Sequence, residues 1–509
     1  MNKYTVRPLK DDDTISVEVP GSKSITNRAL LLAAMRTDKC TLTGVLFSED
    51  SRAFLSCLKE LGFELTINEP AKTVTITGTG GRIPNREASI NVGSAGTAAR
   101  FLTVFLAFAG GDYFLDATPQ MRRRPMEALL TCLKEAGVTI ECTGEEGHFP
   151  FRLRSKGISV NEMSTDTDIS SQYASAMLMS APLLDRGLRV NLTGSRTDGS
   201  YINITLRMMD QFGYSYMREG NSIFVNPACT NSKSDSTTTT NALSNPDGQD
   251  DKNIPTDFTY KIEPDVSAAC YFYAMSPICG KTVQVKNVHL DSMQGDIRFL
   301  KTLEDIGCIV CDTSCNIPDT KPTNDTSDRL NPDNGLVLYP PTSGRYPGID
   351  ISMKDYSDQT MTMAVVAAFA NSPSTIRNIG HIRYQESDRL NAIITELNRL
   401  GCKCEPVSDD NTDATGLHIE PPLTDCADTD YCANTDHSSD TGIPNTQDYE
   451  TNSHGMHGAD IETYEDHRIA MAFSLTGLRI PGVSILNPMC CKKTFENYFE
   501  VLDSLCIDE

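Results

Sequence analysis

The sequence predicts an α/β protein built from six repeated units, three in each of two domains. Two interleaved series of helix patterns indicate this fold class, one amphipathic and the other apolar on nearly every side. Segments rich in Ser, Thr, Asn and Asp interrupt the second half of the chain. The length of 509 residues supports the division, because chains beyond about 300 residues usually form more than one hydrophobic core.

The first series consists of helix patterns that end at a glycine and continue into alternating, strand-like residues. The glycines are Gly62, Gly137, Gly213, Gly307 and Gly401, in segments such as "LKELGFELTI" and "LNRLGCKCEP". A glycine after the last helical turn adopts the left-handed conformation that ends a helix without strain. Their spacings of 75, 76, 94 and 94 residues define the repeat. A sixth copy without the glycine is expected in "YFEVLDSLCI".

The second series is apolar nearly all round, and such helices are buried inside a domain. Its members are "ALLLAAM" after Lys23, "AARFLTVFLAFAG" after Thr97, "YASAMLMSAPLL" after Gln172, "AACYFYAMSPI" after Ser267, "MTMAVVAAFA" after Thr360 and "IAMAFSLTGL" after Arg468. Each unit therefore combines a buried helix, an amphipathic helix and several strands.

The net charge of −23 is concentrated in inserts. Residues 406–462 carry 13 acidic side chains and no Lys or Arg, and residues 227–260 and 312–335 each carry five acidic side chains against two basic ones. Their polar composition buries too little apolar surface to offset chain entropy, so we expect flexible surface loops at about 227–254, 312–335 and 406–462. The overall acidity therefore does not argue against an anionic substrate.

The composition favours a soluble, cytoplasmic protein. There is no run of 18 apolar residues, and the start "MNKYTVRPLKDDD" lacks the apolar core of a signal peptide. The 17 cysteines are scattered, as expected of reduced thiols. The C-x-x-C pair Cys308 and Cys311 has no second pair at a suitable spacing, so we expect no metal site there.

Cations stand where helices are expected to begin. Lys23, Arg124, Arg389, Arg468 and Lys493 are all placed in predicted first turns, where the helix dipole disfavours positive charge. Solvated surface cations beside ordinary capped helices are one explanation. The repetition favours another, in which helix N-termini converge on a strongly anionic ligand. The acids beside these cations, Asp358 and Glu386, are then candidates for proton transfer.

Eight motifs in order resemble a known family. They are "PGSKSITNRALLLAA", "GSAGTAARF", "RRRPM", "SSQYASAMLMSAPL", "SMQGDIRF", "QESDRL", "EDHRIAMAF" and "KKTFENYF". Together they resemble the 5-enolpyruvylshikimate-3-phosphate (EPSP) synthase family, from about residue 15 to 503. The resemblance implies a two-domain inside-out α/β barrel with buried helices and outward-facing sheets. It also implies one domain at 21–258 and another formed by 1–20 plus 259–509.

The resemblance also implies a reaction. The family transfers the enolpyruvyl group of phosphoenolpyruvate to the 5-hydroxyl of shikimate 3-phosphate by addition and elimination, releasing phosphate, without metal or organic cofactor. Both substrates carry phosphate and carboxylate groups, which Arg and Lys bind well. We expect these small molecules as partners, no nucleic-acid or membrane partner, and a monomer.

The family's functional residues carry over to matching positions. The resemblance makes Asp358 and Glu386 the proton-transfer acids, with Lys23 assisting. The implied shikimate 3-phosphate ligands are Lys23, Ser24, Arg28, Ser170, Ser171, Gln172, Tyr201, Asp358 and Gln385. The implied phosphoenolpyruvate ligands are Lys23, Gly96, Arg124, Gln172, Arg389, Arg468 and Lys493.

Four positions depart from the family pattern. Gln385 stands where Lys is usual, and His381 stands where Asn is frequent. "TDGSYI" replaces the usual Ser-[Lys/Arg]-Pro-Tyr, which puts a phosphate-binding role of Ser200 in question. Phe101 follows "GTAAR" where Pro is frequent.

Two alternative functions remain. The sister enolpyruvyl transferase acting on UDP-N-acetylglucosamine typically has Lys-Asn in place of Lys23-Ser24, and a reactive Cys in the loop that here reads "DATPQMRRRPM". A non-enzymatic anion or nucleic-acid binder would use the "MRRRP" cations. A nucleic-acid surface normally combines a basic patch with aromatic residues, whereas this chain has no Trp and cations spread along its repeats.

Overall fold

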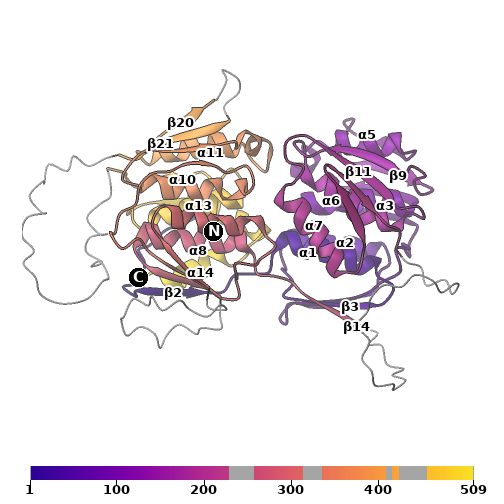
Figure 1. Cartoon of the computed structure of the whole chain (residues 1–509), viewed down its shortest axis with the longest axis horizontal. Helices are drawn as coiled ribbons and strands as arrows, with labels where there is room; N and C mark the ends of the chain where they lie inside the picture. Colours follow the sequence, from indigo (N-terminus) through magenta and orange to yellow (C-terminus); the bar gives the residue numbers. More distant parts are fainter. Residues whose placement is uncertain (1, 229–256, 313–334, 409–414, 423–454, 508–509) are drawn as a thin grey trace, which may run out of the picture. The chain divides into compact units, whose positions relative to one another are not determined.

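The computed structural model describes residues 2–228, 257–312, 335–408, 415–422 and 455–507, which form two compact units (Figure 1). Unit 1 contains Met1–Ile25 and Glu263–Glu509, and unit 2 contains Thr26–Ile262. The domain ranges that the family resemblance implies stay a prediction.

Unit 2 contains three four-stranded sheets with one shared pattern. In each sheet a parallel pair of strands continues into an antiparallel hairpin, as when β14 pairs in parallel with β3 and β3 pairs antiparallel with β5. The first sheet contains β14 (Asp257–Lys261), β3 (Lys39–Thr43), β5 (Thr73–Thr77) and β4 (Leu65–Asn68). The second contains β6 (Glu87–Asn91), β7 (Gly111–Asp116), β9 (Phe151–Ser155) and β8 (Thr139–Cys142). The third contains β10 (Glu162–Asp166), β11 (Leu188–Thr193), β13 (Ser222–Val225) and β12 (Tyr216–Glu219).

Unit 1 repeats this pattern with three more sheets. One contains β16 (Ile309–Asp312), β17 (Leu336–Tyr339), β15 (Thr282–Val285) and β2 (Thr14–Val17). Another contains β18 (Asp350–Ser352), β19 (Ser374–Arg377), β21 (Gly416–Glu420) and β20 (Lys403–Val407). The described strands of the last are β1 (Lys3–Thr5), β23 (Ser484–Leu486) and β22 (Asp460–Ile461). One sheet per repeat agrees with the predicted six-unit α/β fold.

The apolar helices lie in the interior, as predicted. They are α1 (Lys23–Met35), α3 (Gly96–Ala109), α6 (Ser171–Ser180), α8 (Val266–Cys279), α10 (Thr360–Ala368) and α13 (His467–Gly477). Every residue of α10 and α13 is buried, because each helix packs against other helices as well as against a sheet. In Figure 1, α8, α10 and α13 lie between the sheet that holds β20 and β21 and the sheet that holds β2. This arrangement agrees with buried helices enclosed by outward-facing sheets.

The amphipathic helices end as the glycine pattern predicts. They are α2 (Glu49–Glu60), α5 (Glu127–Glu135), α7 (Ser200–Gln211), α9 (Arg298–Asp305), α11 (Arg389–Arg399) and α14 (Tyr498–Leu505). The five glycines have φ values of 86°, 93°, 85°, 105° and 89°, a region where other L-residues are strained. After α2, the Gly62 N–H donates to the Lys59 carbonyl and the Phe63 N–H donates to the Leu58 carbonyl. This pair of bonds is the Schellman motif, which satisfies the last helical carbonyls.

Two of the five predicted helix-start cations are elsewhere. Lys23, Arg389 and Arg468 do lie in the first turns of α1, α11 and α13. Arg124 instead lies between α4 (Pro119–Arg122) and α5, because the following proline disfavours helical conformation at the preceding residue. Lys493 is the last residue of the 3₁₀ helix η5 (Pro488–Lys493), and α14 begins five residues later. The helix-start prediction is therefore wrong for Arg124 and Lys493.

The insert predicted at 406–462 is also partly wrong. Strand β21 lies inside this range and pairs with both β19 and β20, and Leu417 and Ile419 are fully buried. A short alternation of apolar residues was hidden by the polar average of the surrounding segment. The rest of the expected loops, apart from their edges, lies outside the described residues. Among the described helices, none is long and apolar enough to cross a bilayer.

The glycine after α5 provides a test of the helix-ending rule. A Cβ at Gly137 would meet no heavy atom within 4 Å, so Gly137→Ala introduces only backbone strain at φ 93°. We expect a loss of about 1–2 kcal/mol in the free energy of unfolding, measured by urea denaturation. Gly137→Asn should lose less, because Asn tolerates the left-handed region. Gly144→Ala, at an ordinary φ, is the control and should change stability little; equal losses in both alanine variants would contradict the prediction.

Candidate active site

Two arginines in unit 1 hold a single carboxylate. Asp358 lies in the 3₁₀ helix η3 (Ser357–Gln359), directly before α10. Arg389, the first residue of α11, donates from Nη1 to Asp358 Oδ1 over 3.2 Å. Arg468, in the first turn of α13, donates from Nη2 to Asp358 Oδ2 over 2.9 Å. The Asp358 side chain is 13% exposed, so this charged group keeps an opening to solvent or ligand.

Asp466 anchors the same cluster from the start of α13. It is fully buried and caps the helix by accepting from the Arg468 backbone N–H at 2.9 Å. Its Oδ2 also accepts from Arg389 Nε at 2.7 Å and from the Ser387 hydroxyl at 3.0 Å. Burial opposes ionisation of Asp466, but the attraction of Arg389 outweighs it and lowers the pKa.

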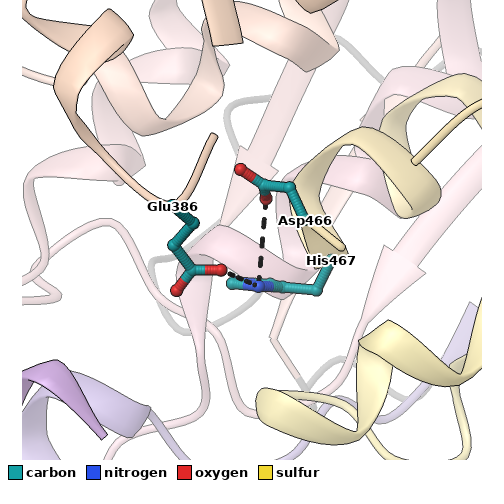
Figure 2. A group of neighbouring side chains, drawn as sticks. All are labelled: Glu386, Asp466 and His467. Atoms are coloured by element: carbon teal, nitrogen blue, oxygen red, sulfur yellow. Dashed lines mark hydrogen bonds and ion pairs between the residues drawn. The ribbon is translucent and has the colours of Figure 1, made fainter. Parts of the chain in front are cut away.

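A second acid–base group lies beside this cluster (Figure 2). Glu386 precedes α11, and its Oε2 is 3.0 Å from Nδ1 of His467, the first residue of α13. Lys493 Nζ is 3.5 Å from the same oxygen. Burial opposes ionisation of Glu386, but His467, Lys493 and Lys23 outweigh it and lower its pKa well below the ordinary value. Burial lowers the pKa of His467, so an ionised Glu386 facing a neutral imidazole is favoured at neutral pH.

Glu386, Asp466 and His467 are also of the types that bind metal ions, with ligand atoms within 4.8 Å of one another. Their oxygens, however, are engaged by cations, Glu386 by Lys493 and Asp466 by Arg389. A metal ion would have to displace these positive charges. The arrangement therefore favours proton transfer over metal binding.

A further buried carboxylate lies next to Asp358. Asp296, in the 3₁₀ helix η2 (Gly295–Ile297), accepts from Gln359 Nε2 at 2.9 Å and from the Ser267 hydroxyl. Burial, together with repulsion by Asp358, raises the pKa of Asp296 to about 6. Asp296 belongs to the motif "SMQGDIRF" but is not among the predicted site residues.

In unit 2, two guanidinium groups converge on the N-terminus of α3. A Cβ at Gly96 would lie 2.6 Å from Nη1 of both Arg100 and Arg124, so a larger residue here would displace the two guanidinium groups. Burial and the charge of Arg124 lower the pKa of Arg100 to about 10, which leaves it positive at neutral pH. Arg100 Nε has no hydrogen-bond partner among the described residues. Two adjacent cations at a helix N-terminus form a favourable environment for an anion.

The N-terminus of α6 lies close to this pair. Ser170 caps α6 by accepting from the Gln172 N–H at 3.2 Å, and Gln172 Nε2 is 3.5 Å from Thr97 Oγ1 at the start of α3. Ser171 is the first residue of α6. Because the free N–H groups of both helices lie at their first turns, this edge of unit 2 offers several donors to one ligand.

Arg28 is the most buried of the predicted ligands. Its side chain in α1 donates from Nε to Thr205 Oγ1 at 2.8 Å and from Nη2 to Ser175 Oγ at 3.1 Å. The guanidinium also lies over the rings of Phe101 and Tyr201, at 5.3 and 5.8 Å from their centroids. Burial lowers its pKa to about 10, so it remains a cation at neutral pH.

The predicted residues divide between the units. Unit 1 holds Lys23, Ser24, Asp358, Gln385, Glu386, Arg389, Arg468 and Lys493, and unit 2 holds Arg28, Gly96, Arg124, Ser170, Ser171, Gln172 and Tyr201. The unusual Gln385 accepts a hydrogen bond from Arg389 Nη1, and the unusual His381 lies 2.8 Å from the Ser357 hydroxyl through Nε2. The ligand and catalytic roles of all these residues stay predictions.

Three members of these clusters were missed from the sequence: Arg100, Asp296 and His467. Arg100 and His467 belong to quoted motifs, "GTAARF" and "EDHRIAMAF", so their position beside predicted ligands was a usable signal.

The sequence model of EPSP synthase (3-phosphoshikimate 1-carboxyvinyltransferase) matches residues 12–502. The chain belongs to the EPSP synthase family. It is 36% identical over 500 residues to the 3-phosphoshikimate 1-carboxyvinyltransferase of Nostoc punctiforme, covering 98% of each chain. The protein of the same name from Neisseria meningitidis serogroup B is 32% identical over 491 residues, covering 96% of this chain and 95% of the relative.

The fold agrees with a solved member of the family. The EPSP synthase structure from Acinetobacter baumannii superposes with a TM-score of 0.69 at 22% identity, covering 99% of this chain and 98% of that one. The six-sheet α/β architecture is therefore the architecture of the family.

The raised pKa of Asp296 predicts a pH-dependent effect of Asp296→Asn. A carboxyl group whose pKa is raised by folding binds its proton more tightly in the folded state, so its ionisation above pH about 6 opposes folding. Removing the charge should raise the stability of the variant relative to wild type by about 1–3 kcal/mol between pH 4 and pH 8, in urea denaturation series.

Asp350→Asn is the control for this series. Its hydrogen bond with Arg377 lowers the Asp350 pKa, so this variant should lose stability relative to wild type over the same range. The prediction is contradicted if Asp296→Asn, like Asp350→Asn, loses stability relative to wild type as the pH rises from 4 to 8.

Proposed function

We propose that this protein transfers the enolpyruvyl group of phosphoenolpyruvate to the 5-hydroxyl of shikimate 3-phosphate, giving 5-enolpyruvylshikimate 3-phosphate and phosphate. Family membership across nearly the whole chain supports this activity. The observation that carries the chemistry is the pair of adjacent acid–base groups in unit 1, Asp358 between two arginines and Glu386 between His467 and Lys493. A single proton-transfer group would not complete both halves of the reaction.

The addition step requires two proton transfers. The 5-hydroxyl loses a proton as its oxygen bonds to the C2 atom of phosphoenolpyruvate, and the C3 atom gains a proton to become a methyl group. We assign the hydroxyl proton to Asp358, which Arg389 and Arg468 hold as a carboxylate. Elimination then removes a proton from the methyl group as the C2–phosphate bond breaks. Ionised Glu386 is suited to accept that methyl proton. We assign the proton that C3 gains during addition to the ammonium group of Lys23, which is protonated again when Glu386 passes on the proton it has accepted. The hydroxyl proton leaves Asp358 with the departing phosphate.

We propose that the site residues predicted from the sequence bind the substrates and their anionic groups. For phosphoenolpyruvate the ligands are Lys23, Gly96, Arg124, Gln172, Arg389, Arg468 and Lys493. For shikimate 3-phosphate they are Lys23, Ser24, Arg28, Ser170, Ser171, Gln172, Tyr201, Asp358 and Gln385. The convergence of Arg100 and Arg124 beside Gly96 supports an anion site in unit 2, because the two like charges repel each other and an anion between them would relieve that repulsion.

The finer assignments are part of the same proposal. The protein acts as a cytoplasmic monomer on small molecules, needs no metal or organic cofactor, and has its domains at 21–258 and at 1–20 plus 259–509. The sister transferase also uses phosphoenolpyruvate, so the two activities differ only in the acceptor. Ser24 after Lys23 favours shikimate 3-phosphate over UDP-N-acetylglucosamine as the acceptor of this protein.

One assay tests the activity. Purified protein is mixed with shikimate 3-phosphate and phosphoenolpyruvate in the presence of a chelator, and phosphate release is measured. We expect release that requires both substrates. The same assay with UDP-N-acetylglucosamine as the acceptor should give none. Folded protein that releases no phosphate with shikimate 3-phosphate would exclude the proposed function.

Lys23 tests the proposed charge balance around Glu386. The Lys23 backbone N–H donates to Asp265 Oδ2 at 3.2 Å, and this bond does not depend on the side chain. The Lys23 ammonium group is one of the cations that stabilise ionised Glu386. Lys23→Met should therefore reduce kcat at least about 1000-fold while the melting temperature changes by only a few degrees. Lys39→Met, an exposed substitution in β3, is the control and should retain full activity. A large loss of thermal stability in Lys23→Met would show that Lys23 is structural.

A further inference from the structure

Phe101 lies against the buried cation of unit 2. Its ring, in α3, is fully buried, and the Arg28 Cζ atom lies 5.3 Å from the ring centroid.

Two helices supply the hydrogen-bond acceptors that orient the Arg28 guanidinium. In α7, the Thr205 hydroxyl accepts from Arg28 Nε at 2.8 Å, and the Tyr201 carbonyl accepts from Arg28 Nη2 at 3.2 Å. In α6, the Ser175 hydroxyl accepts from Arg28 Nη2 at 3.1 Å. These bonds hold the Nε and Nη2 atoms of the planar group, and two aromatic rings lie near its centre.

The aromatic contacts restrict the guanidinium in addition to these hydrogen bonds. A guanidinium within about 6 Å of a ring centroid is attracted to the ring face, and the attraction strengthens when both groups are desolvated. Phe101 from α3 and Tyr201 from α7 both satisfy this distance. Arg28 is 2% exposed, so the contact with Phe101 is shielded from water. Unlike a carboxylate, a ring stabilises the cation without placing a negative charge beside it.

We propose that Phe101 is a positioning residue that orients Arg28 and thereby sets the affinity for shikimate 3-phosphate. This inference rests on the proposed function, in which Arg28 binds that substrate. Phe101 itself does not contact the reacting atoms. Its effect is therefore on binding of shikimate 3-phosphate, and neither kcat nor the KM for phosphoenolpyruvate depends on it.

The test compares two leucine substitutions in the same helix of the full-length protein. Phe101→Leu removes the ring beside Arg28. Phe105→Leu removes an equally buried ring one turn further along α3, which faces Phe63 at 6.4 Å between centroids. The two variants lose similar apolar volume from the same core. Both variants should therefore show any effect that comes from loss of core packing. Only Phe101→Leu should show an effect that comes from the loss of the ring beside Arg28.

Three quantities are measured: the dissociation constant of shikimate 3-phosphate by calorimetry, the KM values for both substrates, and kcat. We expect Phe101→Leu to weaken shikimate 3-phosphate binding about 3- to 30-fold, the range of a cation–π contact, with kcat and the phosphoenolpyruvate KM within twofold of wild type. Phe105→Leu should leave all of these unchanged. Phe101→Met, which fills the site with an unbranched chain, should match Phe101→Leu and serves if the leucine variant folds poorly.

The outcomes separate this inference from the proposed function. If wild type releases phosphate but Phe101→Leu and Phe101→Met keep wild-type affinity for shikimate 3-phosphate, the positioning role is excluded and the function stands. Equal weakening in Phe101→Leu and Phe105→Leu excludes it as well, because the effect is then one of core packing. If wild type neither binds shikimate 3-phosphate nor releases phosphate, the function itself is excluded and this inference with it.

Discussion

The buried ion pair between Arg389 and Asp466 is the interaction on which the chemistry of unit 1 depends. Both side chains are almost completely removed from water, and a buried charge without a partner costs several kcal/mol. The pair fixes the start of α11 against the start of α13. That contact in turn orients Arg389 toward Asp358. It also brings Glu386, which precedes α11, within hydrogen-bonding distance of His467, the first residue of α13. The geometry of both acid–base groups thus follows from one charge pair.

The same neighbourhood gives similar carboxyl groups different proton affinities. Glu386 lies among His467, Lys493 and Lys23 and is held ionised, whereas Asp296 faces Asp358 in a buried position and has its pKa raised to about 6. Environments that separate pKa values in this way are how one site performs both proton donation and proton acceptance. An enolpyruvyl transfer needs both, since each proton that is added must also be removed.

Unit 2 accommodates buried cations by a different route. In unit 1 the arginines are paired with carboxylates, while Arg28 is held by hydroxyls, a carbonyl and aromatic rings, and Arg100 and Arg124 adjoin each other at Gly96. Neutral and aromatic partners orient a cation without adding a negative charge beside it. Residues of this kind are suited to bind phosphate and carboxylate groups, and residues of unit 1 are suited to transfer protons.

The sequence alone determined the repeat, the buried helices, the glycine helix ends and most of the clustered residues, because these depend on local periodicity and backbone conformation. The tertiary structure decided which charges meet. Asp466 pairs with Arg389 across 77 positions, and Phe101 meets Arg28 from a different helix. It also placed Arg124 and Lys493 outside helix starts, and recruited Leu417 and Ile419 into β21 from a segment of polar composition. Contacts between distant segments depend on packing in three dimensions, and no local pattern in the chain encodes them.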